Sequence, residues 1–169
     1  MIEEARRLVR EARERLVVSG WPRELSALSE VLEDAARAKV TAYIFSHAAI
    51  PADVCGVHFS YGFEEAAVES FWRHRLVIVA DDARTLIAAT ERSDSDNAVV
   101  SETAAIAEIA TSQIALDLTL LAQRHGFDTR ELMARILGER VGRLDELLAV
   151  SAQPTLGRRV APAKKRAAR

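Results

Sequence analysis

Apolar and polar positions follow the period of an α-helix through the first part of the chain. From Ile2 to Val18 one stripe is apolar, and oppositely charged residues four positions apart occupy the other side. Gly20 suits a left-handed cap at the end of this helix, and Pro22 suits the first turn of the next. The pattern therefore predicts two amphipathic helices at the N-terminus.

The middle of the chain supports two interpretations. Three segments are rich in β-branched and aromatic residues, which is typical of short strands: 39–45, 54–61 and 76–80. If they form a sheet, its edge would present Ser46, His47, Ser60, Tyr61, Asp81 and Asp82, where α/β proteins usually place their sites.

A helical interpretation competes with this sheet. Apolar residues from Val68 to Ile87 stay in phase at a helical period, and no glycine, proline or asparagine interrupts them. We therefore favour one long helix from Glu64 to about Arg92. In that case Asp81 and Asp82 are solvated charges near its middle.

A second long helix is expected from the apolar segment Ala98–Ala122, after a polar loop at Ser93–Asn97. Its apolar residues cover more than half of the circumference, so it needs several packing partners. Gln113 and Asp117 fall inside the apolar arc. A buried carboxylate needs a donor or a cation, so the pair is a candidate buried polar site, with an arginine from a neighbouring helix as the structural alternative.

A helical hairpin is predicted where this helix ends. Gly126 suits a left-handed cap, and a last helix is expected from Thr129 to about Val150. The spacing of Ala122, Gly126 and Leu132 resembles that of a helix-turn-helix motif. The resemblance implies DNA binding through residues 112–137, with these candidate contacts in the hairpin and tail: Arg130, Arg135, Lys164, Lys165 and Arg166.

Composition and charge divide the chain into a body and a tail. Of 169 residues 49% are hydrophobic, with seven glycines and four prolines, which favours one helical domain over residues 1–151. The net charge is −2, but charge is unevenly distributed, because the residues after position 157 include six basic ones and no acidic one. We expect residues 152–169 to be a disordered basic tail.

The sequence offers little evidence for catalysis. It has no nucleophile elbow, phosphate loop or dinucleotide fingerprint. His47, Cys55 and His58 supply metal-ligand types but only one close pair, so no metal or other cofactor is expected. A single cysteine excludes an internal disulfide, and the charged N-terminus lacks a secretory leader. Charges inside the longest apolar segment argue against a membrane span, so a cytoplasmic location is expected.

The sequence thus predicts an all-α bundle of about five helices that ends in a long αα-hairpin. The alternative is an α/β fold with a small three-stranded sheet from residues 39–80. The favoured function is a non-enzymatic interaction or regulatory module that associates with itself or with another helical protein. The alternatives are the DNA-binding regulator and a small α/β enzyme with its site at His47, Ser60 and Asp81.

Overall fold

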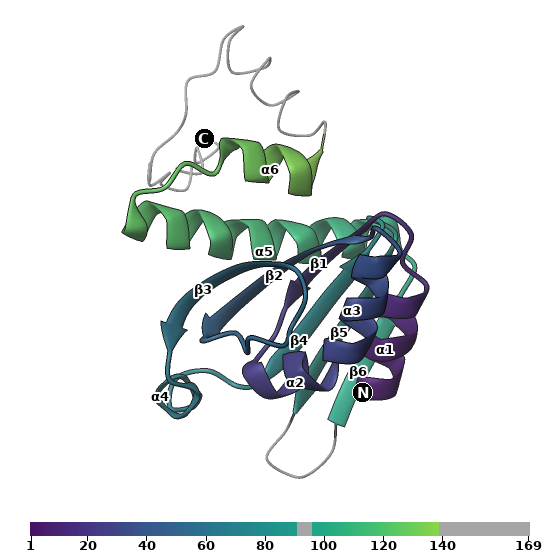
Figure 1. The fold of residues 1–169 in the computed structure, drawn as a ribbon, viewed down its shortest axis with the longest axis horizontal. Coiled ribbons are helices and arrows are strands. Elements are labelled where there is room, and N and C mark those ends of the chain that lie inside the picture. Colours follow the sequence, from purple (N-terminus) through teal and green to yellow (C-terminus); the bar gives the residue numbers. More distant parts are fainter. Residues whose placement is uncertain (91–95, 139–169) are drawn as a thin grey trace, which may run out of the picture.

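A six-stranded sheet with helices on both faces organises the chain, as seen in the computed structural model (Figure 1). The structure describes residues 1–90 and 96–138. The strands are β1 (Arg15–Ser19), β2 (Thr41–Ala48), β3 (Val57–Phe63), β4 (Arg75–Ala80), β5 (Arg84–Thr90) and β6 (Asp96–Ser101). The helices are α1 (Ile2–Arg10), α2 (Pro22–Ala27), α3 (Ser29–Arg37), α4 (Glu65–Glu69), α5 (Ala104–His125) and α6 (Arg130–Leu137). The predicted all-α bundle is therefore wrong.

The sheet has a parallel half and an antiparallel half. Its strand order is β3-β2-β1-β4-β5-β6. β1, β2 and β3 run parallel to one another, whereas β4 runs antiparallel to β1 and continues into an antiparallel meander through β5 and β6. The carboxyl ends of the three parallel strands therefore meet the beginning of β4 at one edge.

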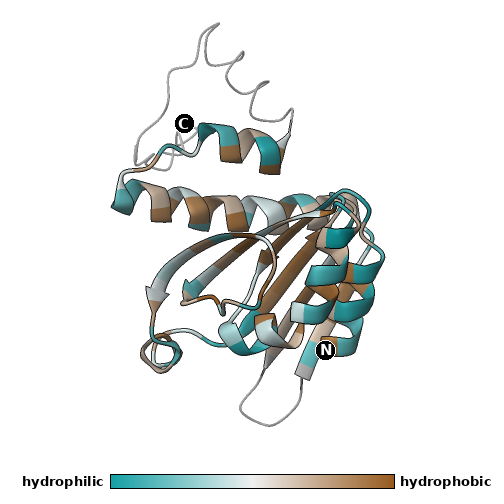
Figure 2. Ribbon diagram, in the orientation of Figure 1, coloured by the Kyte–Doolittle hydropathy of each residue, from teal (hydrophilic) through white to brown (hydrophobic). Residues whose placement is uncertain are grey.

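The central strands of the sheet are buried on both faces. Leu16 and Val18 of β1 point into one core, which also contains apolar residues of α1, α2 and α3. Val17 points to the opposite core, which is closed by α5 and α6. Figure 2 shows the central strands as the most hydrophobic part of the ribbon. Strands buried on both faces are apolar at consecutive positions and lose the alternation that identifies half-exposed strands.

This loss of alternation explains why the long helix predicted from Glu64 to Arg92 is wrong. The segment is divided into α4, β4 and β5. In β4, Leu76 and Ile78 pack into the core beside α1 and α3, while Val79 packs into the core beside α5. The break that the pattern lacked is made by Asp81 and Asp82, which adopt positive φ angles of 52° and 55° between β4 and β5. Asp enters this left-handed region more readily than most residues.

Two other predicted helices are shorter than expected. The first ends at Arg10, and the apolar residues that follow form the buried strand β1. The second long helix begins at Ala104, because Ala98–Ser101 belong to β6. The α/β alternative has the correct class but contains only three of the six strands. The loop at Ser93–Asn97 lies mostly outside the described residues, as do the end of the last predicted helix and the basic tail.

The hairpin of α5 and α6 is present as predicted. Gly126 ends α5 with a φ of 71°, and its N–H donates to the Ala122 carbonyl at 2.7 Å. Met133 and Ile136 of α6 are buried with α5 and the sheet. By length and composition alone α5 would suit a membrane crossing, but one of its faces is buried on the sheet.

Candidate functional site

The edge where the parallel strands end gathers residues that are distant in sequence. β1 leads into α2 here, β3 leads into α4, and β4 begins here. In open α/β sheets, ligands bind preferentially outside the carboxyl ends of the strands. We call this region the carboxyl edge.

Four aromatic rings form a continuous stack at the carboxyl edge. His47 stacks on Tyr61, with ring centroids 5.9 Å apart and planes within 15°, and on Trp72, with centroids 5.1 Å apart and planes within 21°. Tyr61 in turn stacks on Phe63, at 5.5 Å with planes only 1° apart. We call these four residues the aromatic stack. They come from β2, β3 and the segment after α4, so the stack ties these elements together.

An apolar pocket of about 310 Å³ adjoins the aromatic stack. Its walls are apolar and aromatic side chains of β3, α4 and the segment after α4: Phe63, Ala67, Val68, Phe71 and Trp72. Phe71 is 80% exposed, and Phe63 and Trp72 are each nearly half exposed. Large apolar side chains exposed next to each other are typical of a binding surface, and the volume lies at the low end of the range for small-molecule sites.

His47 supplies a neutral polar group to this surface. Partial burial lowers the pKa of His47; the negative charge of Asp117 raises it and the positive charge of Arg75 lowers it, and the net pKa is below its ordinary value of 6.5. The imidazole is therefore mainly uncharged at neutral pH, and an uncharged ring both donates and accepts hydrogen bonds.

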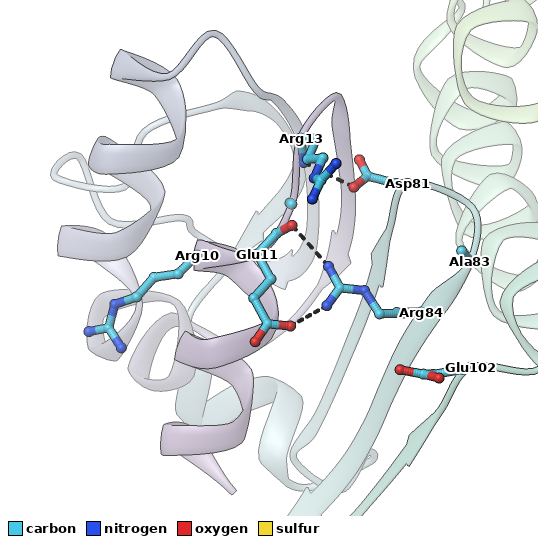
Figure 3. Close-up of a pocket in the computed structure, with 8 residues that line it drawn as sticks. Arg10, Glu11, Arg13, Asp81, Ala83, Arg84 and Glu102 are labelled. Atoms are coloured by element: carbon cyan, nitrogen blue, oxygen red, sulfur yellow. Dashed lines mark hydrogen bonds and ion pairs between the residues drawn. The ribbon is translucent and has the colours of Figure 1, made fainter.

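A second, polar pocket lies at the opposite edge of the sheet, between α1 and the β4–β5 turn (Figure 3). Two of its charged groups, Arg84 and Glu11, bind each other. Arg84 forms an ion pair with the Glu11 carboxylate and donates to the Glu11 carbonyl oxygen at 3.0 Å. Asp81 accepts hydrogen bonds from three consecutive backbone N–H groups, those of Arg13, Glu14 and Arg15, at 2.9, 2.9 and 3.0 Å.

These contacts explain the ionisation of Asp81. Partial burial raises its pKa, but the three backbone hydrogen bonds and the charge of Arg84 together outweigh this effect, so the pKa lies below the ordinary value of 3.8. Asp81 thus holds the chain between α1 and β1 as an ionised acceptor. The arrangement is structural, because the carboxylate is occupied by the protein's own backbone.

The enzyme constellation predicted at His47, Ser60 and Asp81 is not assembled. His47 and Ser60 lie near the carboxyl ends of β2 and β3, whereas Asp81 follows β4, which runs in the opposite direction, and so lies at the other edge. The Ser60 hydroxyl donates to the Ala48 carbonyl oxygen and accepts from the Gly62 N–H, both at 2.7 Å. It stabilises a local turn and has no base beside it among these contacts.

His47, one of the metal ligands considered from the sequence, is separated from His58 and Cys55. His58 pairs with Ile44, whose side chain enters the core beside α2 and α3, whereas His47 faces the α5 side. Cys55 precedes β3 and lies at the opposite end of that strand from the aromatic stack.

The other candidate residues lie on α5, on α6 and beyond. Gln113 is exposed and Asp117 is only half-buried, so the pair, with Nε2 3.5 Å from each carboxylate oxygen, does not form a buried polar site. Arg130 binds Asp128 and Arg135 binds Glu131, both at the surface. Lys164, Lys165 and Arg166 lie outside the described residues.

The sequence interpretation overlooked the aromatic surface after β3. Phe63, Phe71 and Trp72 fall within ten positions of each other, among charged residues, in a chain with only 5% aromatic residues. That local concentration was the available signal. The helical interpretation places Phe71 and Trp72 on the apolar stripe of a long helix, which hides the exposure of these two side chains.

Comparison with known proteins supports the α/β fold. Among solved structures, one similar protein is TrmBL2, described as an archaeal chromatin protein that shows a novel mode of DNA binding. The two share 7% sequence identity with a TM-score of 0.50, over 67% of this chain and 46% of that one. The chain thus corresponds to less than half of TrmBL2, and the likeness concerns the fold. No curated protein sequence matches the chain.

The family comparison is more specific. Residues 1–112, about two thirds of the chain, match the family described as the transcriptional regulator TrmB, EBD N-terminal subdomain. The matched range extends from α1 into α5 and includes the whole sheet and the carboxyl edge. The chain therefore belongs to the TrmB transcriptional regulator family, and its residues 1–112 correspond to the EBD N-terminal subdomain of that family.

Proposed function

We propose that this regulatory subdomain binds a small organic ligand with a flat apolar face in the pocket at the carboxyl edge. The observation that carries the proposal is the pocket itself, where Phe71 and Trp72 expose their rings beside the aromatic stack. Stacking of one aromatic pair contributes about 0.5–1.5 kcal/mol beyond the apolar area that it buries. A flat ligand covering these rings would gain this energy and remove the exposed apolar surface from water.

The location of the pocket suits regulation. Its walls come from β3, α4 and the segment leading to β4, and Trp72 contacts His47 of β2. A ligand in the pocket would therefore contact β3, α4 and the segment that leads to β4. Binding to one arrangement of these elements shifts the protein towards that arrangement, which is how a ligand regulates a protein.

Dye binding tests this proposal. The probe is 8-anilinonaphthalene-1-sulfonate, which fluoresces in apolar sites, added to the folded chain. We expect saturable binding that Phe71→Ser weakens at least several-fold, because Phe71 is the most exposed wall of the pocket. Phe127→Ser is the matched control, since Phe127 is 40% exposed but lies between α5 and α6. Equal effects of the two variants, or none, would reject the pocket as the binding site.

Self-association is a second candidate function, favoured by the outer surface of α5. Ile109, Leu116 and Leu120 are 66%, 63% and 42% exposed on the side of α5 opposite its buried face. An apolar ridge of this spacing suits packing against the same helix of a second copy. Sedimentation velocity should show a dimer that Leu116→Asp dissociates. A monomer at high micromolar concentration would exclude this function.

DNA binding by the hairpin is a third candidate, since TrmBL2 is described as a DNA-binding protein. In this chain both hairpin arginines are ion-paired with acidic neighbours, Arg130 with Asp128 and Arg135 with Glu131, which reduces their charge toward a phosphate. If the hairpin binds duplex DNA, the affinity falls steeply with salt and is weakened by Arg130→Ala. Absence of binding at low salt would exclude the hypothesis. The cytoplasmic location and the single domain over residues 1–151 remain predictions.

A further inference from the structure

A cluster of three potential metal ligands lies at the carboxyl edge, on the side of α4 that does not line the pocket. Glu65 and Glu69 are one turn apart on α4, and His74 precedes β4. One ligand atom from each of the three side chains lies within 4.8 Å of the others. His74 Nε2 is 2.7 Å from Glu69 Oε1. The imidazole and two carboxylates thus converge on one point.

The other nitrogen of His74 faces a buried carboxylate. His74 Nδ1 lies 3.2 Å from Oε1 of Glu24, a residue of α2 that is only 2% exposed. The His74 ring is also stacked on Trp21, with centroids 4.1 Å apart and planes within 12°. Histidines that bind metals usually donate their second ring N–H to a carboxylate or carbonyl, which fixes the tautomer and the ring orientation. Glu24 and Trp21 supply this support for His74.

The buried Glu24 carboxylate is only partly matched by its neighbours in the described chain. Oε1 of Glu24 lies 3.2 Å from both the His74 imidazole and the Arg23 guanidinium, whereas its buried Oε2 has no hydrogen-bond partner among residues 1–90 and 96–138. A buried carboxylate with an unmatched oxygen is costly. Three carboxylates surround one imidazole, and the Arg23 side chain is 65% exposed. A cation at His74 Nε2 would offset this excess of negative charge.

We propose that Glu65, Glu69 and His74 bind a first-row divalent cation of the Zn²⁺ type, with Glu24 as the positioning residue of His74. One imidazole and two carboxylates form a donor set that suits Zn²⁺ and its neighbours, and three protein ligands leave a position for water. Tetrahedral binding at about 2.1 Å separates ligand atoms by roughly 3.4 Å. The Nε2–Oε1 distance therefore has to open by less than 1 Å, which rotation of the half-exposed Glu69 side chain allows.

The proposed site would join three elements of the fold. α4 is a five-residue helix with Val68 as its buried residue. A cation would link α4 to the beginning of β4 and, through His74 and Glu24, to α2. Because Val68 and Trp72 of the same segment line the apolar pocket, the cation would also stabilise one wall of that pocket.

Titration of the metal-free chain with Zn²⁺ tests the proposal. Calorimetry measures the binding, and the thermal unfolding temperature measures its effect on stability. We expect one equivalent to bind with a rise in unfolding temperature, and Glu65→Gln or Glu69→Gln to weaken binding at least tenfold. Glu24→Gln should weaken it about 10–100-fold, as loss of such a supporting contact typically does. Co²⁺ in place of Zn²⁺ should give visible absorption bands that Glu69→Gln abolishes.

Two controls test the specificity of the result. His58→Ala removes an imidazole outside the cluster, and Glu33→Gln removes an exposed carboxylate of α3. Both variants should leave Zn²⁺ affinity unchanged. Absence of Zn²⁺ binding at micromolar concentration by the folded chain would overturn the proposal. Binding that is insensitive to Glu65→Gln and Glu69→Gln would overturn it too, since the cation would then lie elsewhere.

Discussion

Replacing Asp81 with Asn should destabilise the chain through the connection between α1 and β1. Asp81 accepts three backbone hydrogen bonds at 2.9–3.0 Å and is ionised. Asn has one acceptor oxygen, and its NH₂ group would face N–H donors, so at least one donor loses its partner. Hydrogen bonds to charged groups contribute about 1.5–3 kcal/mol each when shielded. Because this site is open to solvent, we expect a total loss of about 1–2 kcal/mol.

Urea unfolding followed by circular dichroism measures this loss, and Asp82→Asn is the matched control. Both residues have positive φ, which Asn also adopts, so the backbone cost is the same in the two variants. Asp82 contributes only a partly exposed ion pair with Arg15, and its replacement should cost less than about 1 kcal/mol. Equal losses in the two variants would refute the role assigned to the Asp81 hydrogen bonds.

The pH dependence gives an independent check. The folded pKa of Asp81 lies below its ordinary value of 3.8, so the unfolded chain binds a proton first as pH falls. The stabilisation by Asp81 is fully present above the unfolded pKa and is lost as pH falls through the folded pKa. The stability difference between wild type and Asp81→Asn should therefore be constant above about pH 5 and should narrow below about pH 4. A difference that grows on acidification would contradict the argument.

Variants at three further positions test the packing, each by urea unfolding at neutral pH. Gly56→Ala should lower the free energy of unfolding by about 2–3 kcal/mol, because the φ of Gly56 is 150° and an added Cβ would lie 2.7 Å from Ile44 Cδ1. A neutral effect would show that the backbone is placed differently. Gly126→Ala should lower the free energy of unfolding by only about 1 kcal/mol, since its φ is 71° but no atom of the described part of the chain lies within 4 Å of the added Cβ. Gly126→Asn should cost less. Ile136→Ala should cost about 2–4 kcal/mol, because Ile136 is fully buried; a loss below about 1 kcal/mol would show that α6 is not packed on the sheet.

The site was predictable in part. The sheet interpretation placed His47, Ser60 and Tyr61 together from local sequence, and the parallel strands β2 and β3 do bring them to one edge. It also placed Asp81 there, which the antiparallel direction of β4 prevents. The same reversal brings His74 to the carboxyl edge beside Glu24, fifty residues earlier in the chain. Strand direction depends on pairing between distant segments, and no local pattern reports it.

The sequence by itself determined the features that depend on neighbours along the chain. The hairpin at Gly126 is one, because a left-handed cap strongly favours glycine at that position. The apolar character of 39–45, 54–61 and 76–80 is another, and these segments correspond largely to β2, β3 and β4.

Only the tertiary structure decided whether the apolar segments became helix or strand, and where their ends lie. In β1 and β4 both faces are covered, by α1–α3 on one side and by α5 and α6 on the other. A strand buried on both faces carries no alternation, so its sequence is as compatible with a buried helix as with a strand. The choice depends on hydrogen bonds to partner strands that are distant in the chain, and the same pairing determines which side chains meet at the carboxyl edge.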